Sequence, residues 1–158
     1  MRERDRRIRP RRTTKLRVVE DFAAPPERVF ALIQSEEGFL DAMPPGVEVL
    51  SWPERFGRDE VLDLRWGAAG VFPVRWTAVI DAYEEGRSFS DLQVRGPFRY
   101  WRHTHTVEPH GTGTRHTDLV EISTGLGPAG DLAAAVGLRG AFGPRLKRMR
   151  ASLESDRT

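Results

Sequence analysis

The chain has 158 residues, of which 39% are hydrophobic and 30% are charged. This length is enough for one domain with its own core, and the composition is that of a globular protein rather than of a disordered or fibrous one. Because the sequence holds no cysteine, disulfides, thiol chemistry and zinc sites built on thiolates are excluded. No apolar run approaches the roughly 20 residues of a membrane span, and no apolar leader opens the chain, so we expect a cytoplasmic protein.

The net charge of +2 is spread unevenly along the chain. Residues 1–17 hold nine Arg or Lys against two acidic residues, a local charge of +7 that leaves about −5 for the remainder. We expect residues 1–13 to be a basic, disordered arm that contacts anionic surfaces only weakly, ahead of a single domain over residues 14–155. The acidic body offers no basic face to extend the arm, so no stable nucleic-acid or membrane partner is expected.

The first part of the domain predicts one strand and two short helices. Apolar residues alternate from Leu16 to Phe22, as in a strand. Pro25 and Pro26 suit the start of a first helix, where a missing N–H costs nothing. Ser35 is a good N-cap for a second helix, which the prolines at positions 44 and 45 would end.

The middle of the chain has the alternation of apolar and polar residues that is typical of strands. The connections are short and turn-like, so we expect antiparallel neighbours joined as hairpins. The expected strands are Val47–Ser51, Val61–Trp66, Phe72–Tyr83, Ser88–Arg95, Arg99–Glu108 and Thr114–Thr124.

A long amphipathic helix is expected to close the domain, after a loop over residues 125–130. Pro144 and the glycines near it predict a kink or a break around positions 140–144. The fold class is therefore α+β: a curved antiparallel sheet of about seven strands, two short helices and a long C-terminal helix. One helix is narrower than such a sheet, so the space between them is either filled by bulky side chains or open to a ligand. The expected apolar stripe of this helix is Leu132, Val136, Phe142, Leu146, Met149 and Leu153.

The most informative segment is the strand that follows the Gly-Pro turn at positions 96 and 97. Its alternate residues Trp101, His103, His105 and Val107 share one face. Each imidazole on an apolar face needs a hydrogen-bond partner of its own. Such a face suits a cavity wall better than a solid core.

The register of this strand decides which polar groups join the two histidines. If the next turn centres near positions 111 and 112, His105 lies opposite Asp118. A three-residue loop at 96–98 places Asp91 beside His103 and Gln93 beside Trp101. A one-residue slip in the hairpin that turns near positions 111 and 112 separates these groups. A two-residue loop in the hairpin that turns near positions 96–98 does so as well.

The order of elements and a short signature resemble the Bet v 1-like or START-like superfamily of helix-grip proteins. This is also called the polyketide cyclase/dehydrase and lipid-transport superfamily, and the chain resembles a bacterial ligand-binding group within it. The resemblance covers roughly residues 14–153 and implies a hydrophobic cavity under the C-terminal helix, without a defined reaction, because the superfamily mixes carriers, sensors and a few cyclases. Pro144 departs from the family's long straight helix. The signature is Phe89-Ser-Asp91-Leu-Gln93-Val-Arg-Gly96-Pro97-Phe98, Trp101-Arg-His103-Thr-His105, Gly113-Thr114 and Asp118-Leu-Val120.

Three interpretations of the polar cluster remain open. Its groups can fix the register of the sheet, orient a mostly apolar ligand, or carry out acid–base chemistry through His103, His105 and Asp118. Metal binding by these three residues has no further support in the sequence, so no metal and no cofactor are expected.

We expect a protein that binds or sequesters a small hydrophobic ligand, lipid-like or a polyketide or other aromatic, rather than an enzyme. The alternative is a polyketide cyclase or dehydratase in which His103 and His105 act as acid–base groups. The expected ligand-binding residues are Trp66, Trp76, Asp91, Gln93, Phe98, Trp101, His103, His105, Val120, Ile122, Phe142, Leu146 and Met149.

Overall fold

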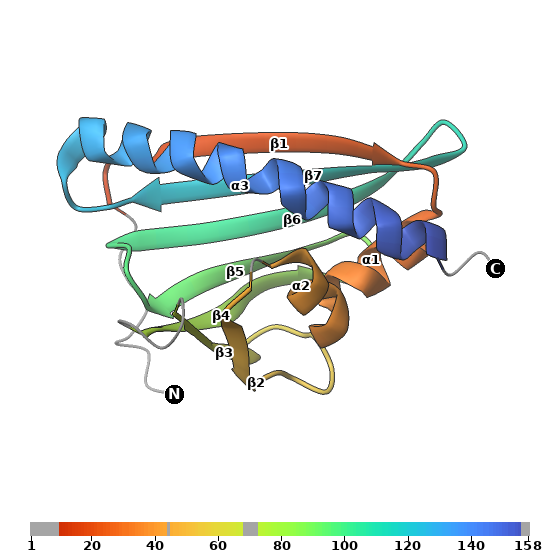
Figure 1. The fold of residues 1–158 in the computed structure, drawn as a ribbon, viewed down its shortest axis with the longest axis horizontal. Helices are drawn as coiled ribbons and strands as arrows, with labels where there is room; N and C mark the ends of the chain where they lie inside the picture. Colours follow the sequence, from red (N-terminus) through yellow and green to blue (C-terminus); the bar gives the residue numbers. More distant parts are fainter. Residues whose placement is uncertain (1–9, 44, 68–72, 156–158) are drawn as a thin grey trace.

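The computed structural model describes residues 10–43, 45–67 and 73–155 of the chain. They form one seven-stranded antiparallel sheet, two short helices and one long helix, which confirms the predicted α+β class (Figure 1). Residues 1–9 of the expected basic arm and Phe72 of the expected fourth strand lie outside the described residues. Nothing about their structure enters the description below.

The strands form a single open sheet in the order β1-β7-β6-β5-β4-β3-β2. Consecutive strands from β2 to β7 pair with one another, with short turns between β4 and β5, β5 and β6, and β6 and β7, and β1 completes the sheet by pairing with β7 at one edge. The strands are β1 (Thr14–Phe22), β2 (Val47–Ser51), β3 (Val61–Trp66), β4 (Val74–Glu84), β5 (Ser88–Arg95), β6 (Tyr100–His110) and β7 (Gly113–Ser123).

Two irregularities in the β4–β5 pair contribute to the curvature of the sheet. The register shifts between Thr77 and Ala78, and again between Ile80 and Ala82. A bulge adds a residue to one strand of a pair, so that strand bends and its local twist increases. The sheet is thereby wrapped toward the face that the helices cover.

The two short helices form where the prolines and the serine cap predict them. They are α1 (Pro26–Gln34) and α2 (Glu36–Ala42). Pro26 occupies the first position of α1, and the Ser35 hydroxyl accepts a hydrogen bond from the Gly38 N–H at 3.0 Å, as an N-cap does. Both helices lie near the last turns of the long helix and close one end of the concave face (Figure 1).

The long helix α3 (Gly127–Ser155) crosses the concave face of the sheet without a break (Figure 1). A break at 140–144 is therefore ruled out, and the helix begins inside the expected loop. Pro144 removes one backbone hydrogen bond, to the carbonyl of Gly140 on the exposed side. Phe142 and Leu146, on either side of Pro144, are both buried on the inner side, so packing against the core favours a continuous helix here.

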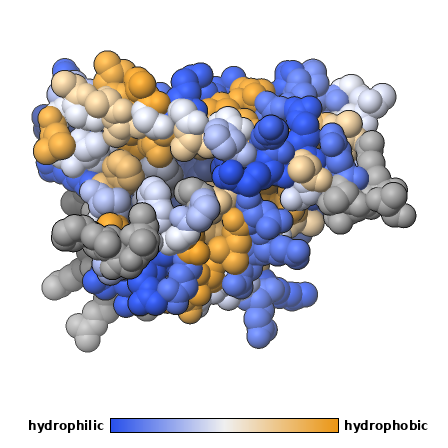
Figure 2. Space-filling view, viewed as in Figure 1, coloured by the Kyte–Doolittle hydropathy of each residue, from blue (hydrophilic) through white to orange (hydrophobic). Residues whose placement is uncertain are grey.

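The buried stripe of α3 differs from the predicted one in its first half. Leu132 and Val136 are 60% and 66% exposed, whereas Asp131 and Ala135 are buried. Asp131 faces inward because its carboxylate accepts hydrogen bonds from the N–H and the hydroxyl of Thr124, which fixes the β7–α3 corner. The exposed apolar residues lie where α3 begins, the orange area at the upper left of Figure 2. None of the described helices is long and apolar enough to cross a membrane.

The apolar core is divided between the two halves of α3. One cluster joins α1, β4 and β5 to the second half of α3, through residues such as Phe30, Ile80 and Met149. The other joins β1, β6 and β7 to its first half, through residues such as Ile122 and Phe142. The candidate site lies between these clusters.

Candidate functional site

A cavity of about 390 Å³ lies between the concave face of the sheet and the three helices. Its wall is made by β2 to β6, by α1 and α2, by the segment between β2 and β3, and by residues 138–149 of α3. Small-molecule sites in proteins typically have volumes of about 300–1,000 Å³. The cavity is large enough for a small organic molecule, and most of the side chains that line it are apolar.

All four tryptophans of the chain line this cavity. The ring of Trp76 meets Trp101 edge-on at 4.9 Å between centroids, and Phe98 at 5.8 Å. Trp52 contacts Phe56 at 5.4 Å on another part of the wall. Trp66 is 48% exposed, which places it where the cavity meets solvent. Aromatic side chains therefore give the cavity large and rigid apolar surfaces.

The structure brings most of the predicted ligand-binding residues to the cavity wall and leaves four behind it. Gln93 is fully buried, and its amide donates to the Phe98 carbonyl at 2.7 Å, so it fixes the turn before β6. Val120, Ile122 and Leu146 belong to the packed core instead. The predicted residues that line the cavity are Trp66, Trp76, Asp91, Phe98, Trp101, His103, His105, Phe142 and Met149.

The polar side of the wall is built around the Asp118 carboxylate, which is 1% exposed. Asp118 lies opposite His105 in the β6–β7 register, as the favourable turn predicts. Its Oδ1 lies 2.8 Å from His103 Nε2, in a hydrogen bond, and 3.1 Å from His105 Nδ1. Its Oδ2 accepts a hydrogen bond of 2.9 Å from Arg145 Nη1 of α3. One buried carboxylate thus joins α3 to His103 by hydrogen bonds and lies in contact with His105.

A second carboxylate, that of Asp91, lies on the other side of the two rings. Asp91 pairs with His103 in the β5–β6 register, as the three-residue loop predicts. Its Oδ2 lies 3.8 Å from His103 Nδ1 and 3.8 Å from His105 Nε2, beyond hydrogen-bond distance. The ring centroids of the two histidines are 3.9 Å apart. Asp91, His103 and His105 all reach the cavity, whereas Asp118 stands behind them.

Burial and charge move the pKa values of this cluster in different directions. Burial raises the pKa of Asp91. Burial also opposes ionisation of Asp118, but Arg145 and the neighbouring histidines outweigh it and hold the pKa of Asp118 well below its usual range. Burial, with the charge of His103 added, lowers the pKa of His105 well below its ordinary value. At neutral pH the cluster therefore holds an ionised Asp118 and a neutral His105.

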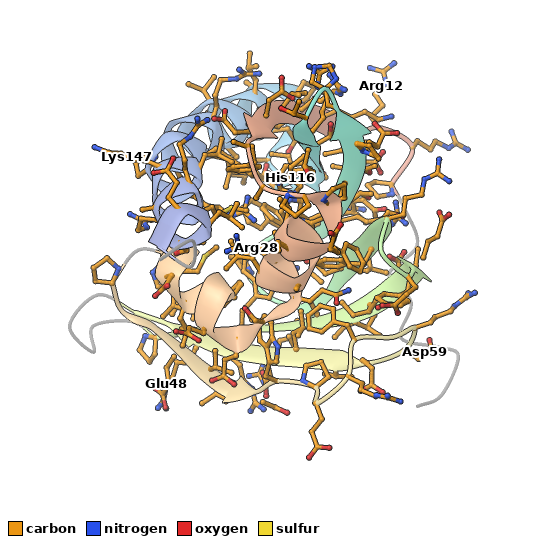
Figure 3. The ribbon with its side chains drawn as sticks, turned by 90° about the vertical axis from the view of Figure 1, so that its right-hand side faces the viewer. Arg12, Arg28, Glu48, Asp59, His116 and Lys147 are labelled. Carbon is orange, nitrogen blue, oxygen red and sulfur yellow. The ribbon has the colours of Figure 1, made fainter. Side chains whose placement is uncertain are left out.

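The sequence analysis misses two members of the cluster. Arg145 is not among the predicted site residues, yet its side chain is only 12% exposed, lines the cavity and covers the Phe142 ring at 5.3 Å. His116 lies in the interior between α3 and the sheet, whereas Lys147 points outward (Figure 3). The sequence signal for His116 is its position two residues before Asp118, which places both residues on the same face of β7.

His116 predicts an acid-sensitive stability. Its ring is fully buried, neither nitrogen has a hydrogen-bond partner among the described residues, and burial lowers its pKa to about 4. The groups that face it are Asp118 at 3.6 Å, Arg145 and the histidines of β6. Because the unfolded chain binds this proton near pH 6.5 and the folded chain does not, the free energy of unfolding falls as pH drops from about 6.5 to about 4.

The measurement is urea unfolding at pH 7 and pH 5 in EDTA, for the wild type and His116→Leu. This ring accounts for about 2 kcal/mol of the loss between those pH values, so the variant should show a smaller loss by that amount. Stability at pH 7 should be preserved, because the leucine leaves no buried nitrogen unpaired. An unchanged pH dependence in the variant would show that His116 does not resist protonation.

Comparison with known proteins gives the same fold and a family. Protein Ms6760 from Mycobacterium smegmatis is 19% identical, with a TM-score of 0.69 over 90% of this chain and 92% of that one. Protein NE0264 from Nitrosomonas europaea is 12% identical, with a TM-score of 0.73 over 90% and 96%. Ara h 8.0201 is 14% identical, with a TM-score of 0.72 over 91% and 99%. Comparison with curated proteins gives no significant match.

The family profile "Polyketide cyclase / dehydrase and lipid transport" matches residues 13–154, almost the whole chain. Its match, the Bet v 1-like architecture of the sheet and helices, and the similarity to Ara h 8.0201 confirm the superfamily that the signature predicts. The chain belongs to the polyketide cyclase / dehydrase and lipid transport family.

Proposed function

We propose that this protein binds a small hydrophobic molecule, lipid-like or aromatic, in the cavity under α3 and carries it without transforming it. The observation that supports this most is the cavity of about 390 Å³ whose wall is aromatic and aliphatic over most of its extent. Transfer of an apolar molecule from water to such a wall is favourable roughly in proportion to the area removed from water. The family includes lipid transport in its description, which is consistent with this proposal.

The polar side of the cavity would orient one end of the ligand. His103, His105 and Arg145 reach the cavity together with Asp91, and no other titratable side chain among the described residues lines it. A few convergent polar groups in an otherwise apolar site fix orientation, while the apolar area supplies most of the affinity. The ligand class that fits is therefore an apolar body with one oxygen-bearing end.

The test uses the tryptophans, because all four line the cavity. 1-Anilinonaphthalene-8-sulfonate (ANS) is titrated into the native protein with excitation of tryptophan. We expect quenched tryptophan emission and sensitised ANS emission that saturates at one probe per chain. Unlabelled fatty acids and polycyclic phenols are then added as competitors, and those that fit the cavity displace the probe.

A second experiment looks for a compound that copurifies with the protein. Freshly purified protein is extracted with organic solvent, and the extract is analysed by mass spectrometry. A stoichiometric apolar compound in the extract identifies a natural ligand class. The proposal is wrong if ANS binds only without saturation and no competitor changes the tryptophan emission.

A catalytic function is the second candidate, because two histidines and a carboxylate face the same cavity. His103 lies between two carboxylates, an arrangement that can orient an imidazole for proton transfer. A cyclase or dehydratase that uses this ring would lose turnover in His103→Gln while keeping its affinity for ANS. A carrier would release the extracted compound unchanged in both the wild type and the variant.

A further inference from the structure

The two imidazoles and the Asp91 carboxylate converge on one point of the cavity wall. One donor atom from each of Asp91, His103 and His105 lies within 4.8 Å of the other two. The carboxylate oxygen is 3.8 Å from each of the two ring nitrogens that face it. We propose that Asp91, His103 and His105 bind a divalent transition-metal ion, with Asp118 as the carboxylate that orients both rings.

The separations suit a metal better than they suit direct hydrogen bonds. A hydrogen bond between these groups needs about 2.7–3.2 Å, and both measured distances are longer. Ligand atoms that surround a zinc ion at about 2.0–2.1 Å in tetrahedral geometry lie about 3.4 Å from one another. The Asp91 carboxylate needs to approach each ring by only a few tenths of an ångström to reach that spacing.

In both histidines, Asp118 contacts one ring nitrogen, and the other ring nitrogen faces Asp91, where it can bind a metal ion. An ionised carboxylate only accepts hydrogen bonds, so the His103 nitrogen bonded to Asp118 carries the proton. A neutral His103 then keeps its lone pair on Nδ1, the nitrogen that faces Asp91. His105 presents Nδ1 to Asp118 and Nε2 to Asp91. A carboxylate behind the ligating histidines is the usual support of a metal site in proteins.

The charges of the cluster also call for a cation on the side of Asp91. Arg145 pairs with Asp118 and compensates its charge. Within the described part of the chain, Asp91 has neither a lysine nor an arginine at ion-pair distance. A buried carboxylate is costly unless it is paired or coordinates a metal. A divalent ion between Asp91 and the two rings would supply the missing partner.

A second group of possible ligands, His105, His116 and Asp118, shares one residue with this site but suits a metal less well. All three of its side chains are buried, and Asp118 already pairs with Arg145. The Asp91 group instead faces the cavity, where coordination positions can remain for a ligand oxygen. Two imidazoles and one carboxylate suit Zn²⁺, Co²⁺ or Fe²⁺ rather than Ca²⁺ or Mg²⁺.

The experiment titrates the full chain, stripped with EDTA and dialysed, with Co²⁺ or Zn²⁺ and no apolar ligand. We expect one ion per chain, visible Co²⁺ bands typical of a nitrogen and oxygen ligand set, and displacement of Co²⁺ by Zn²⁺. Asp91→Asn and His103→Gln should each weaken binding at least about tenfold. Circular dichroism confirms that each variant is folded.

The remaining two histidines give the controls. His110→Gln changes an exposed ring that is not part of the cavity wall and should leave the affinity unchanged. His116→Leu removes a member of the second group and should also leave one tight ion per chain. The proposal is overturned if folded Asp91→Asn binds Co²⁺ as the wild type does, or if only His116→Leu loses it. Because no apolar ligand is present, this outcome is independent of whether the cavity binds one.

Discussion

Replacing Asp118 with alanine should lower the free energy of unfolding by about 3–5 kcal/mol, a large part of the stability of a domain this size. The substitution removes the acceptor of the Arg145 guanidinium and of His103 at once. Both donors are largely buried, so water cannot replace the carboxylate. Urea unfolding followed by tryptophan fluorescence at pH 7, with EDTA present, measures the change.

Two controls separate burial from charge pairing. Asp21 makes two hydrogen bonds of 2.8 Å with Arg115, but both side chains are exposed, so Asp21→Ala should change stability far less. The double variant Asp118→Ala with Arg145→Met should recover part of the loss, because it leaves no buried guanidinium unpaired. If Asp118→Ala costs no more than Asp21→Ala, the buried carboxylate does not hold α3 to the sheet.

Replacing Ala78 with phenylalanine should abolish ligand binding while the domain stays folded. Ala78 is a buried residue of β4 whose side chain lines the cavity. A phenyl ring there occupies space that the ligand needs, and the cavity can accept it with little of the strain of overpacking. We expect the affinity for ANS to fall at least about 100-fold, measured by tryptophan-sensitised emission.

The matched control is Ala133→Phe, the same substitution on the exposed side of α3. It should bind ANS as the wild type does, and both variants should unfold cooperatively on heating. Retention of ANS affinity in a folded Ala78→Phe protein would place the probe outside this cavity.

The architecture could be predicted because local patterns determine it. Alternating apolar and polar residues define the strands, and short turns join β4 to β7 as hairpins. The pairings of His105 with Asp118 and of Asp91 with His103 belong to one of the registers that the sequence leaves open, and the structure has both.

The course of α3 could not be predicted in the same way. The predicted stripe begins with Leu132 and Val136, whereas the buried residues of this part of the helix are Asp131 and Ala135. The contact of Asp131 with Thr124 is a tertiary one, and it turns the first half of the helix. Tertiary packing also explains why the helix continues past Pro144, although a proline inside a helix tends to break it.

The composition of the site depends on tertiary contacts even more. Arg145 joins Asp118 only because α3 crosses β7, and no spacing in the sequence encodes that crossing. Gln93, Val120 and Ile122 share faces with the cavity residues, yet side-chain packing decides that they lie behind the wall. His116 could have been predicted, because it follows the same alternation along β7 as Asp118 and Val120 and therefore shares their face of the sheet.

Calorimetric titration of the native protein with ANS at several temperatures addresses the cavity most directly. Entry of an aromatic probe into an apolar interior predicts one site per chain and a negative heat-capacity change. Heats without saturation, or a heat-capacity change near zero, would contradict the existence of an internal binding site under α3.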